Sequence, residues 1–532
     1  MNKEYLKWLN GDFVTNEDKE ILARMTEEEI NKCFSNELEF GTAGIRDIMG
    51  LGNSRLNKYT IGRVTLGFAN YLNKKYKNPS VVIGYDTRTN SREFAFLAAS
   101  ILNYNGIKTY ISKDISSTPL ISFSTKYLKC SGGIVITASH NPKEYNGYKV
   151  YGSNGGQIVP GVDKEIEKEI NLVDYTDVKE APISNELFNY IGEDVINKFN
   201  NENEKVIINK EYIDKYANDL KVTYTSFHGT GIRTVPFILE KYGIRYNLVN
   251  EQCKIDNEFT FAPSPNPEIE ENFVLGKEYA NDLKSDVILA TDPDSDRIGV
   301  LYRKDGDYIA LNGNEIGIIF IDYLLNNKKI VKGNYIVRSI VSSNIVDKIC
   351  DYYQANVVEC LTGCKNVIAK KELDPENYLF GFEESLGYVF NIDVNDKNSF
   401  SSIIFMLEIL CYLKSKDMTL GDYLEEIYSK YGYYSHKTMS IKFDNLKDRE
   451  TIMNKIRKDN IFKGETIDYL NNKDDLKSNT LKIILNDNEY FMIRPSGTEP
   501  KLKIYFIVND TSFDKSNDRL DNLIDKVMEE LK

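Results

Sequence analysis

Three aspartates stand at alternate positions directly after an apolar run, in ILATDPDSDRIGVLY, where they are Asp292, Asp294 and Asp296. Three carboxylates in one short loop repel one another, so something must neutralise them. A hard divalent cation suits oxygen ligands, and Mg²⁺ keeps positions for water and for a phosphate oxygen. The loop therefore predicts a metal site, with a solvated acidic turn or a calcium loop as alternatives. Arg297, which follows immediately, suits a bound anion.

A second loop places a serine at the end of an apolar strand pattern. In GGIVITASHNPKEYNGYKVYG, residues 132–152, the run Ile134–Ile136 leads into Ser139 and His140, and Lys149 follows ten residues after the serine. Loops that are held by rigid strands are common places for catalytic residues. The pattern predicts a chemical role for Ser139, and the alternative is a polar turn that ends the strand.

A third loop, in IRPSGTEPKLKIY, combines the residues that bind anions. Its candidates are Arg494, Ser496, Gly497 and Thr498. A glycine lets successive backbone N–H groups form an anion-binding concavity, and an arginine adds a bidentate fork. The loop predicts a phosphate site, and the alternative is a tight hairpin turn.

Two weaker patterns point in the same direction. Glu383 and Ser385 in FGFEESLGYVF suit sugar hydroxyls, because carboxylates accept hydrogen bonds, although a helix-capping glutamate fits equally well. Arg46 follows the glycine-containing GTAGIR loop. The cations that stand near these motifs are Arg46, Lys149, Arg297, Lys365, Arg494 and Lys501. They supply the local positive charge that an acidic protein needs to bind an anion.

Composition excludes several classes of partner. The net charge of −13 argues against nucleic acid and against an anionic membrane as the main partner. No signal-peptide pattern is seen at the N-terminus, and the most apolar runs are too short to span a bilayer. The seven cysteines include no CxxC pair, which favours reduced thiols. We therefore expect a cytoplasmic protein without a zinc site.

Alternating strand and helix patterns surround these loops. Residues 1–40 predict a helical prefix in which Thr26 and Glu29 form a capping box. The later βαβ rhythm predicts an α/β fold with three similar mixed α/β domains and a smaller C-terminal α+β domain. A polar stretch at 425–437 separates the last domain from the others. The predicted domains are 1–205, 206–312, 313–428 and 429–532.

The motifs together resemble the α-D-phosphohexomutase superfamily, and in particular its longer cytosolic branch of phosphoglucomutases and phosphopentomutases. The resemblance rests on FGTAGIR from residue 40, TASHNP (137–142), DPDSDR (292–297), GFEES (381–385) and RPSGTEP (494–500), and it covers about residues 40–505. It implies that the four domains surround a central cleft.

The resemblance also implies a role for each candidate. Ser139 would be the phosphoserine, and with Asp292, Asp294 and Asp296 it would hold Mg²⁺. Arg46, His140, Lys149 and Arg297 match positions around the transferred phosphoryl group. The implied sugar contacts are Thr362, Gly363, Lys365, Glu383 and Ser385, and the implied phosphate loop is Arg494, Ser496, Gly497 and Thr498.

The implied reaction moves a phosphoryl group between C1 and C6 of glucose through glucose 1,6-bisphosphate, which also serves as activator. Lys149 and His140 are the candidate bases, and Lys149 is favoured if neighbouring cations lower its pKa. Pentose and mannose phosphates are alternative substrates. A Mg²⁺-dependent sugar phosphatase and a silent sugar-phosphate-binding protein are alternatives from other classes. We expect a small phosphosugar as partner, no nucleic acid or membrane, and a monomer or homodimer.

Overall fold

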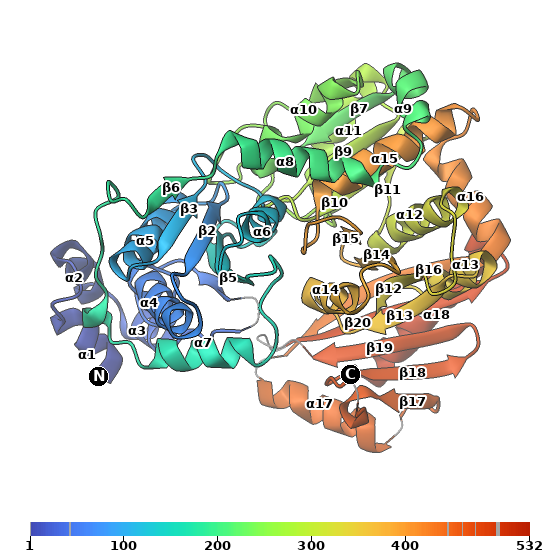
Figure 1. The fold of residues 1–532 in the computed structure, drawn as a ribbon. Helices are drawn as coiled ribbons and strands as arrows, with labels where there is room; N and C mark the ends of the chain where they lie inside the picture. Colours follow the sequence, from blue (N-terminus) through green and yellow to red (C-terminus); the bar gives the residue numbers. More distant parts are fainter. Residues whose placement is uncertain are drawn as a thin grey trace. The chain divides into compact units, whose positions relative to one another are not determined.

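The computed structural model describes residues 2–41, 44–443, 446–459, 461–473, 475–495 and 501–531 (Figure 1). The chain divides into two compact units. The first unit comprises Met1–Leu311 and Leu386–Asp417, and the second comprises Asn312–Ser385 and Met418–Lys532.

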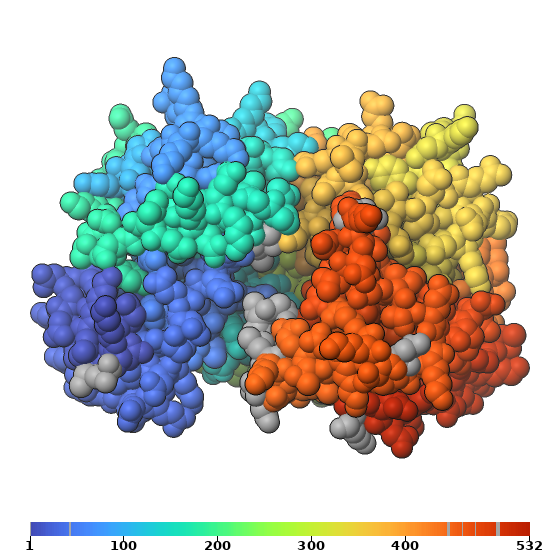
Figure 2. Space-filling view, turned by 90° about the horizontal axis from the view of Figure 1, so that it is seen from below, coloured from blue at the N-terminus to red at the C-terminus, as the bar shows by residue number. Residues whose placement is uncertain are grey.

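The first unit begins with the predicted helical prefix. Its helices are α1 (Lys3–Asn10), α2 (Asn16–Ala23) and α3 (Glu27–Cys33). Thr26 and Glu29 form the predicted capping box at the start of α3. The prefix has a small aromatic core around Trp8, which is fully buried. In the space-filling view it lies, in dark blue, against the start of the next domain (Figure 2).

The first α/β domain carries the serine loop. Its sheet has the order β1-β5-β4-β2-β3-β6, with β1 Ile45–Ile48, β2 Ser80–Tyr85, β3 Lys108–Ile111, β4 Gly132–Ile136, β5 Tyr145–Gly152 and β6 Phe188–Tyr190. Its helices are α4 Lys58–Lys75, α5 Ser91–Tyr104, α6 Thr118–Tyr127 and α7 Val162–Asn171. Strand β4 is buried along its whole length, as expected for a strand that is covered on both faces. It pairs parallel with β2 and antiparallel with β5, so its end is held from both sides.

The second α/β domain carries the aspartate loop. Its sheet has the order β11-β10-β9-β7-β8, with β7 Lys221–Thr225, β8 Arg245–Leu248, β9 Val287–Thr291, β10 Ile298–Lys304 and β11 Asp307–Ala310. Its helices are α8 Glu193–Asn203, α9 Lys210–Tyr216, α10 Val235–Lys241 and α11 Val274–Leu283. Strands β9 and β10 are antiparallel neighbours joined by the acidic loop.

The segment Leu386–Asp417 completes the first unit with β15 (Gly387–Phe390) and α15 (Ser399–Lys414). Helix α15 is buried almost throughout, as its apolar sequence predicts. Its one carboxylate, Glu408, accepts hydrogen bonds from the backbone N–H groups of Ile208 and Asn209 at 2.9 and 2.7 Å. A buried carboxylate needs such partners, so these bonds explain how a glutamate fits in the apolar helix.

The second unit contains a parallel α/β domain and the C-terminal domain. In the α/β domain β12 (Tyr335–Ser339) pairs parallel with β13 (Asn356–Cys360) and β14 (Tyr378–Glu383). The helices of this domain are α12 Gly313–Asn327, α13 Ile345–Tyr353, α14 Cys364–Leu373 and α16 Leu420–Tyr431.

The C-terminal domain has an antiparallel sheet in the order β16-β20-β19-β18-β17. Its elements are β16 Tyr433–Lys442, α17 Leu446–Asp459, β17 Glu465–Asp468, β18 Leu481–Asn486, β19 Glu489–Pro495, β20 Lys501–Asp510 and α18 Phe513–Glu530. The three α/β domains and the C-terminal α+β domain confirm the predicted fold class.

The polar stretch at 425–437, which the sequence predicts to separate the last domain, is formed by regular elements. Helix α16 runs to Tyr431, and strand β16 begins at Tyr433, so one residue joins two regular elements. That residue, Gly432, has a φ of +107°, a conformation that glycine adopts without strain. Glu425, Glu426, Lys430 and Lys437 lie on exposed helix and strand surfaces, whereas Ser435 is buried. Within the described ranges, none of the helices has both the length and the apolar character that a membrane crossing requires.

Candidate active site

Ser139 stands in a strained backbone conformation between β4 and β5. Its φ is +51°, in the left-handed region that non-glycine residues rarely adopt. Such a conformation costs on the order of 1 kcal/mol and persists only where the surroundings enforce it. The Ser139 N–H donates to Thr137 Oγ1 at 2.8 Å, and the residue is buried. The predicted serine is therefore held at the strand end rather than lying in a mobile turn.

Arg88, which the sequence analysis missed, holds the serine loop in place. Its guanidinium nitrogens donate to the carbonyl oxygens of Ser139 at 2.6 Å and Asn141 at 2.5 Å, and to those of Pro142 at 2.8 Å and Tyr145 at 3.1 Å. A planar guanidinium can make several bonds in one fixed geometry, which an ammonium cannot. Arg88 therefore links the loop from its serine to the first residue of β5.

Asp86 is the buried partner of Arg88. Its Oδ2 lies 3.3 Å from Arg88 Nε, and both side chains are fully buried. Asp86 Oδ1 also accepts the N–H of Arg88 at 2.9 Å and the hydroxyl of Ser91 at 2.7 Å. Burial raises the pKa of Asp86 and lowers that of Arg88, and each charge opposes the shift of the other. The sequence signal for this pair is GYDTR, in which opposite charges follow a buried strand.

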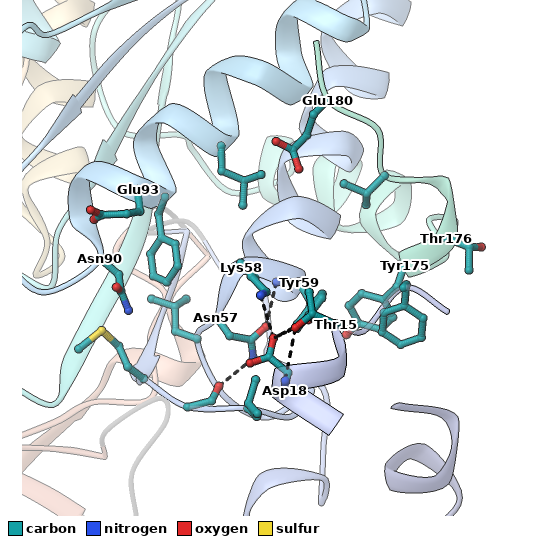
Figure 3. A pocket seen from close by; sticks show the side chains of 18 of the residues that line it. Thr15, Asp18, Asn57, Lys58, Tyr59, Asn90, Glu93, Tyr175, Thr176 and Glu180 are labelled. Atoms are coloured by element: carbon teal, nitrogen blue, oxygen red, sulfur yellow. Dashed lines mark hydrogen bonds and ion pairs between the residues drawn. The ribbon is translucent and has the colours of Figure 1, made fainter. Parts of the chain in front are cut away.

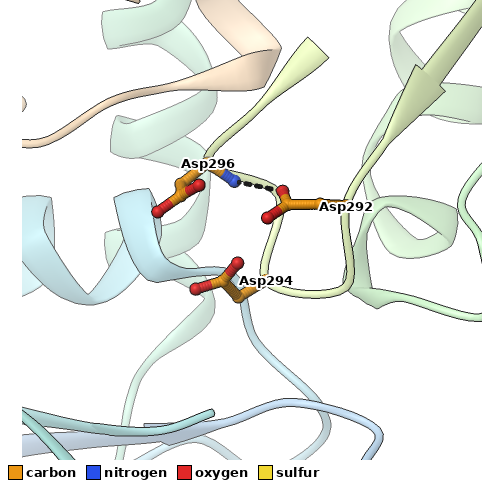
Figure 4. A group of neighbouring side chains, drawn as sticks. All are labelled: Asp292, Asp294 and Asp296. Atoms are coloured by element: carbon orange, nitrogen blue, oxygen red, sulfur yellow. Dashed lines mark hydrogen bonds between the residues drawn. The ribbon is translucent and has the colours of Figure 1, made fainter. Parts of the chain in front are cut away.

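The three predicted aspartates meet in one buried loop. One carboxylate oxygen from each of Asp292, Asp294 and Asp296 lies within 4.8 Å of the others, and all three residues are buried. Figure 4 shows the three side chains together on the loop between β9 and β10. Asp292 Oδ1 accepts the backbone N–H groups of Asp296 and Arg297, each at 3.0 Å. These bonds curl the loop around the first carboxylate.

The serine loop and the aspartate loop are in contact. Ser139 Oγ donates to Asp292 Oδ2 at 2.8 Å. Thr118, at the start of α6, binds Asp294 through its hydroxyl at 2.8 Å and through its backbone N–H at 2.9 Å. The structure thus brings the predicted serine to the predicted metal ligands, and Thr118 is a second contact that the sequence analysis missed.

Two lysines neutralise part of the carboxylate charge. Lys149 Nζ lies 2.6 Å from Asp294 Oδ2 and 3.4 Å from Asp296 Oδ2, and Lys397 Nζ lies 3.3 Å from the same Asp296 oxygen. Burial raises the pKa of Asp292 well above its usual value, and the neighbouring carboxylates raise it further. Burial also opposes ionisation of Asp294, but the Lys149 ammonium holds its pKa below the usual value.

The donor set fits a hard divalent cation. Asp294 Oδ1 and Asp296 Oδ1 are buried and have no hydrogen-bond partner among the described residues. Unpaired buried carboxylate oxygens are costly unless a cation or water satisfies them. With the adjacent Asp292 they offer the kind of oxygen ligands that Mg²⁺ takes.

The other predicted residues of the first unit surround the serine. His140 Nδ1 lies 3.3 Å from Ser139 Oγ, and Arg46 Nη1 lies 3.4 Å from Asn141 Oδ1. Arg297 lies beside the aspartates, with its Nε 3.9 Å from Asp296 Oδ1. Burial lowers the pKa of His140 well below its usual value, and Arg297 and Arg46 lower it further.

Lys149 does not meet the condition that was set for it as a base. Burial lowers its pKa, but the carboxylates of Asp294 and Asp296 outweigh burial and raise the pKa above its usual value. The charged groups that contact it in the described structure are carboxylates rather than cations. In this geometry Lys149 is a counter-charge to the two carboxylates.

Several predicted sugar contacts of the second unit also lie together. Glu383 ends β14, and its carboxylate accepts the backbone N–H of Gly363, beside Thr362. Lys365 lies in the first turn of α14, which begins just after that glycine. Ser385 lies two residues beyond the end of β14.

The phosphate loop falls mostly outside the described residues. Arg494 lies in β19, opposite Lys503 of β20. Ser496, Gly497 and Thr498 lie outside the described residues. Their role stays a prediction.

Family models match most of the chain. Four descriptions of the phosphoglucomutase/phosphomannomutase family match in order: alpha/beta/alpha domain I at residues 37–177, domain II at 197–306, domain III at 312–431 and the C-terminal domain at 441–517. The chain is 37% identical over 521 residues to a phosphoglucomutase of Staphylococcus haemolyticus, which covers 92% of this chain and 94% of that protein. It is 34% identical over 553 residues to a phosphoglucomutase of Staphylococcus aureus, with 98% of each chain covered.

Solved structures share the fold. The open form of parafusin, a phosphoglucomutase from Paramecium, matches with a TM-score of 0.72 and 18% identity over 93% of this chain and 95% of that one. The N-acetylphosphoglucosamine mutase of Aspergillus fumigatus, in complex with GlcNAc-6P and magnesium, matches with a TM-score of 0.55 and 14% identity over 94% and 97% of the two chains. With the full-length sequence matches, these findings confirm the resemblance: the chain belongs to the phosphoglucomutase/phosphomannomutase family of the α-D-phosphohexomutase superfamily.

Proposed function

We propose that this protein is a phosphoglucomutase, an isomerase that moves a phosphoryl group between C1 and C6 of glucose phosphate. The reaction passes through phospho-Ser139 and glucose 1,6-bisphosphate. The observation that carries the proposal is the contact between Ser139 Oγ and Asp292 Oδ2 at 2.8 Å, inside the buried aspartate cluster. The names of the full-length relatives support glucose phosphate as the substrate.

Ser139 Oγ is the phosphoryl carrier in this proposal. Its backbone is already fixed by Arg88, so the hydroxyl needs little reorganisation to face the aspartates. Asp292, Asp294 and Asp296 would hold Mg²⁺ together with an oxygen of the phosphorylated serine. Bound there, Mg²⁺ supplies Lewis-acid neutralisation of the charge on the transferring phosphoryl group.

Cationic side chains of the chain itself add to this stabilisation. Phosphate monoesters react very slowly without a catalyst, and enzymes accelerate their transfer mainly by positioning and by charge stabilisation. Arg46 contacts the serine loop, while Lys149 and Arg297 lie beside the aspartates. All three would stabilise the phosphoryl oxygens in the transition state.

A base must take the proton of the attacking sugar hydroxyl, and we assign this role to His140. Its Nδ1 lies 3.3 Å from Ser139 Oγ, at the point where the phosphoryl group is transferred. Lys149 is less suited because its ammonium group already donates to Asp294 at 2.6 Å.

The second unit would hold the sugar and the phosphate that is not being transferred. Glu383 and Ser385 would read the hydroxyls of the sugar, with Thr362, Gly363 and Lys365 beside them. Arg494, with Ser496, Gly497 and Thr498, would bind the distal phosphate through charge-assisted hydrogen bonds. Because the bisphosphate must present each of its phosphates to Ser139 in turn, these contacts must accept the sugar in two orientations.

Coupled turnover tests the proposal. Glucose 1-phosphate is supplied with Mg²⁺ and trace glucose 1,6-bisphosphate, and formation of glucose 6-phosphate and release of free phosphate are both followed. Ribose 1-phosphate and mannose 1-phosphate are measured in parallel. We expect glucose 1-phosphate to give the highest kcat/KM, with little free phosphate.

Two serine variants provide the comparison. Ser139→Ala should lose turnover, while Ser153→Ala, in the exposed turn after β5, should keep it. Full activity of Ser139→Ala would refute the mechanism. Free phosphate as the main product would identify a phosphatase instead, and a preference for the pentose or mannose substrate would change the assigned sugar.

A further inference from the structure

A large pocket lies in the first unit, between the helical prefix and the first α/β domain (Figure 3). Its volume is about 920 Å³, within the size range of small-molecule sites in proteins. None of the proposed catalytic, metal or sugar residues lines it. The pocket therefore needs an explanation separate from the mutase reaction.

One side of the pocket is a well-packed apolar and aromatic surface. The rings of Phe13 and Tyr175 are stacked at 5.1 Å, with 13° between their planes. Leu56, Phe94 and Tyr175 are all buried in the core of this unit. Side chains that are packed from behind cannot collapse into the space in front of them, so the pocket is preformed. Such a surface suits the aromatic or alkyl body of a ligand.

The charged residues of the pocket are Asp12, Asp18, Glu93, Glu180 and Lys58, so most of them are acidic. Asp18 is already neutralised, because Lys58 Nζ lies 2.8 Å and the Tyr59 hydroxyl 2.6 Å from its Oδ2. Asp12, Glu93 and Glu180 also line the pocket and are exposed, and no ion pair of theirs is found among the described residues. Figure 3 shows Glu93 and Glu180 on different sides of the pocket, both away from Asp18.

We propose that this pocket is a binding site for a small organic cation with an aromatic or alkyl body. The body would lie on the stacked rings of Phe13 and Tyr175, and the exposed carboxylates of Glu93 and Glu180 would attract the cationic head. The same carboxylates repel phosphosugars, so the pocket is not a second substrate site.

The chain carries its own reporter for this site. Trp8 is the one tryptophan of the sequence, and it is fully buried. Its ring lies 5.7 Å from that of Phe13 and 5.2 Å from those of Tyr59 and Tyr175, all of which line the pocket. A ligand that contacts these rings changes the surroundings of Trp8, and excitation at the red edge of the spectrum selects tryptophan over tyrosine.

The experiment titrates the full-length protein with 4-phenylbutylamine and, separately, with 4-phenylbutyrate. The two probes share a body and differ in the sign of their charge. Trp8 fluorescence follows binding, and calorimetry measures it independently. We expect saturable binding of the amine and binding of the acid that is weaker by about tenfold or more. Absence of saturable amine binding, or equal binding of the two probes, would overturn the proposal.

Matched variants locate the binding. Exposed charge pairs contribute only modestly to binding, so Glu93→Gln with Glu180→Gln should weaken amine binding about fivefold. Glu186→Gln, an exposed carboxylate outside the pocket lining, should leave it unchanged. Leu97→Trp, which fills part of the pocket, should abolish binding in calorimetry while melting temperature and turnover stay near wild type. Unchanged amine binding in the double glutamine variant or in Leu97→Trp would place the probe elsewhere and refute the site.

Discussion

Replacing Arg88 by lysine keeps a positive charge beside Asp86 but removes the planar fork that holds the serine loop. The guanidinium of Arg88 serves four carbonyl oxygens, of Ser139, Asn141, Pro142 and Tyr145, in addition to its ion pair with Asp86. An ammonium has three donors and no fixed plane, so at least two acceptors lose their partner. The left-handed conformation at Ser139 then loses its main support.

The expected loss in activity is large because the serine must be positioned accurately. A displacement of about 1 Å in a reacting group can lower the rate about a hundredfold, and we expect Arg88→Lys to lower kcat by about that factor. KM should change less than about threefold, because Arg88 contacts the serine loop rather than the proposed sugar residues. Arg92→Lys, which changes an exposed arginine of α5, is the matched control and should keep wild-type kcat.

A second pair of variants separates positioning from stability. Arg88→Met leaves the fully buried Asp86 without its cation, which should cost about 3–5 kcal/mol of folding stability. Adding Asp86→Asn removes the unpaired charge and should restore part of the melting temperature. It does not restore the donors to the loop carbonyls, so kcat should stay low. Wild-type kcat in Arg88→Lys, or recovery of kcat together with stability in the double variant, would refute the positioning role.

Two further predictions follow from the carboxylates of the two units. Asp294→Asn should lower kcat about a hundredfold and abolish the rise in melting temperature that Mg²⁺ gives the wild type. The control Asp305→Asn, in an exposed hairpin turn, should keep the wild-type kcat and the wild-type rise in melting temperature. A rise in melting temperature with Mg²⁺ in Asp294→Asn would contradict the metal site. Burial and the neighbouring Glu383 raise the pKa of Glu384 from 4.5 to about 7. Because the folded-state pKa lies above the unfolded value, the wild type loses folding stability as pH rises from about 4.5 to about 7. Glu384→Gln should therefore be more stable than wild type by up to about 3 kcal/mol at pH 8 but not at pH 4. Thermal melts at both pH values check this, and equal melting temperatures at pH 8 would contradict it.

The strand-end loops could be predicted from local pattern alone. An apolar run followed by closely spaced aspartates, or by a serine and a histidine, needs no knowledge of distant contacts. The structure places Ser139 against Asp292, 153 residues further along the chain, which the order of the motifs alone could not establish. The resemblance supplied that link by treating all the loops as parts of one site.

The residues that sequence reasoning missed act through tertiary contacts. Arg88 binds carbonyl oxygens more than 50 residues away, and Thr118 binds an aspartate 176 residues away. Lys397 reaches Asp296 from a polar segment between a buried strand and a buried helix. Every residue has a backbone carbonyl, so the sequence does not show which arginine binds several of them. The pKa of Lys149 likewise depends on the carboxylates that the fold brings to it, and the sequence alone does not show them.

The central claim is that Ser139 carries the phosphoryl group, and direct labelling tests it best. The protein is incubated with Mg²⁺ and glucose 1,6-bisphosphate that is radiolabelled in its phosphates, and peptides are then mapped by mass spectrometry. The account predicts label on the peptide that contains Ser139, loss of that label to added glucose 1-phosphate, and no label in Ser139→Ala. Label on another residue, or label on Ser139 that glucose 1-phosphate does not remove, would contradict it.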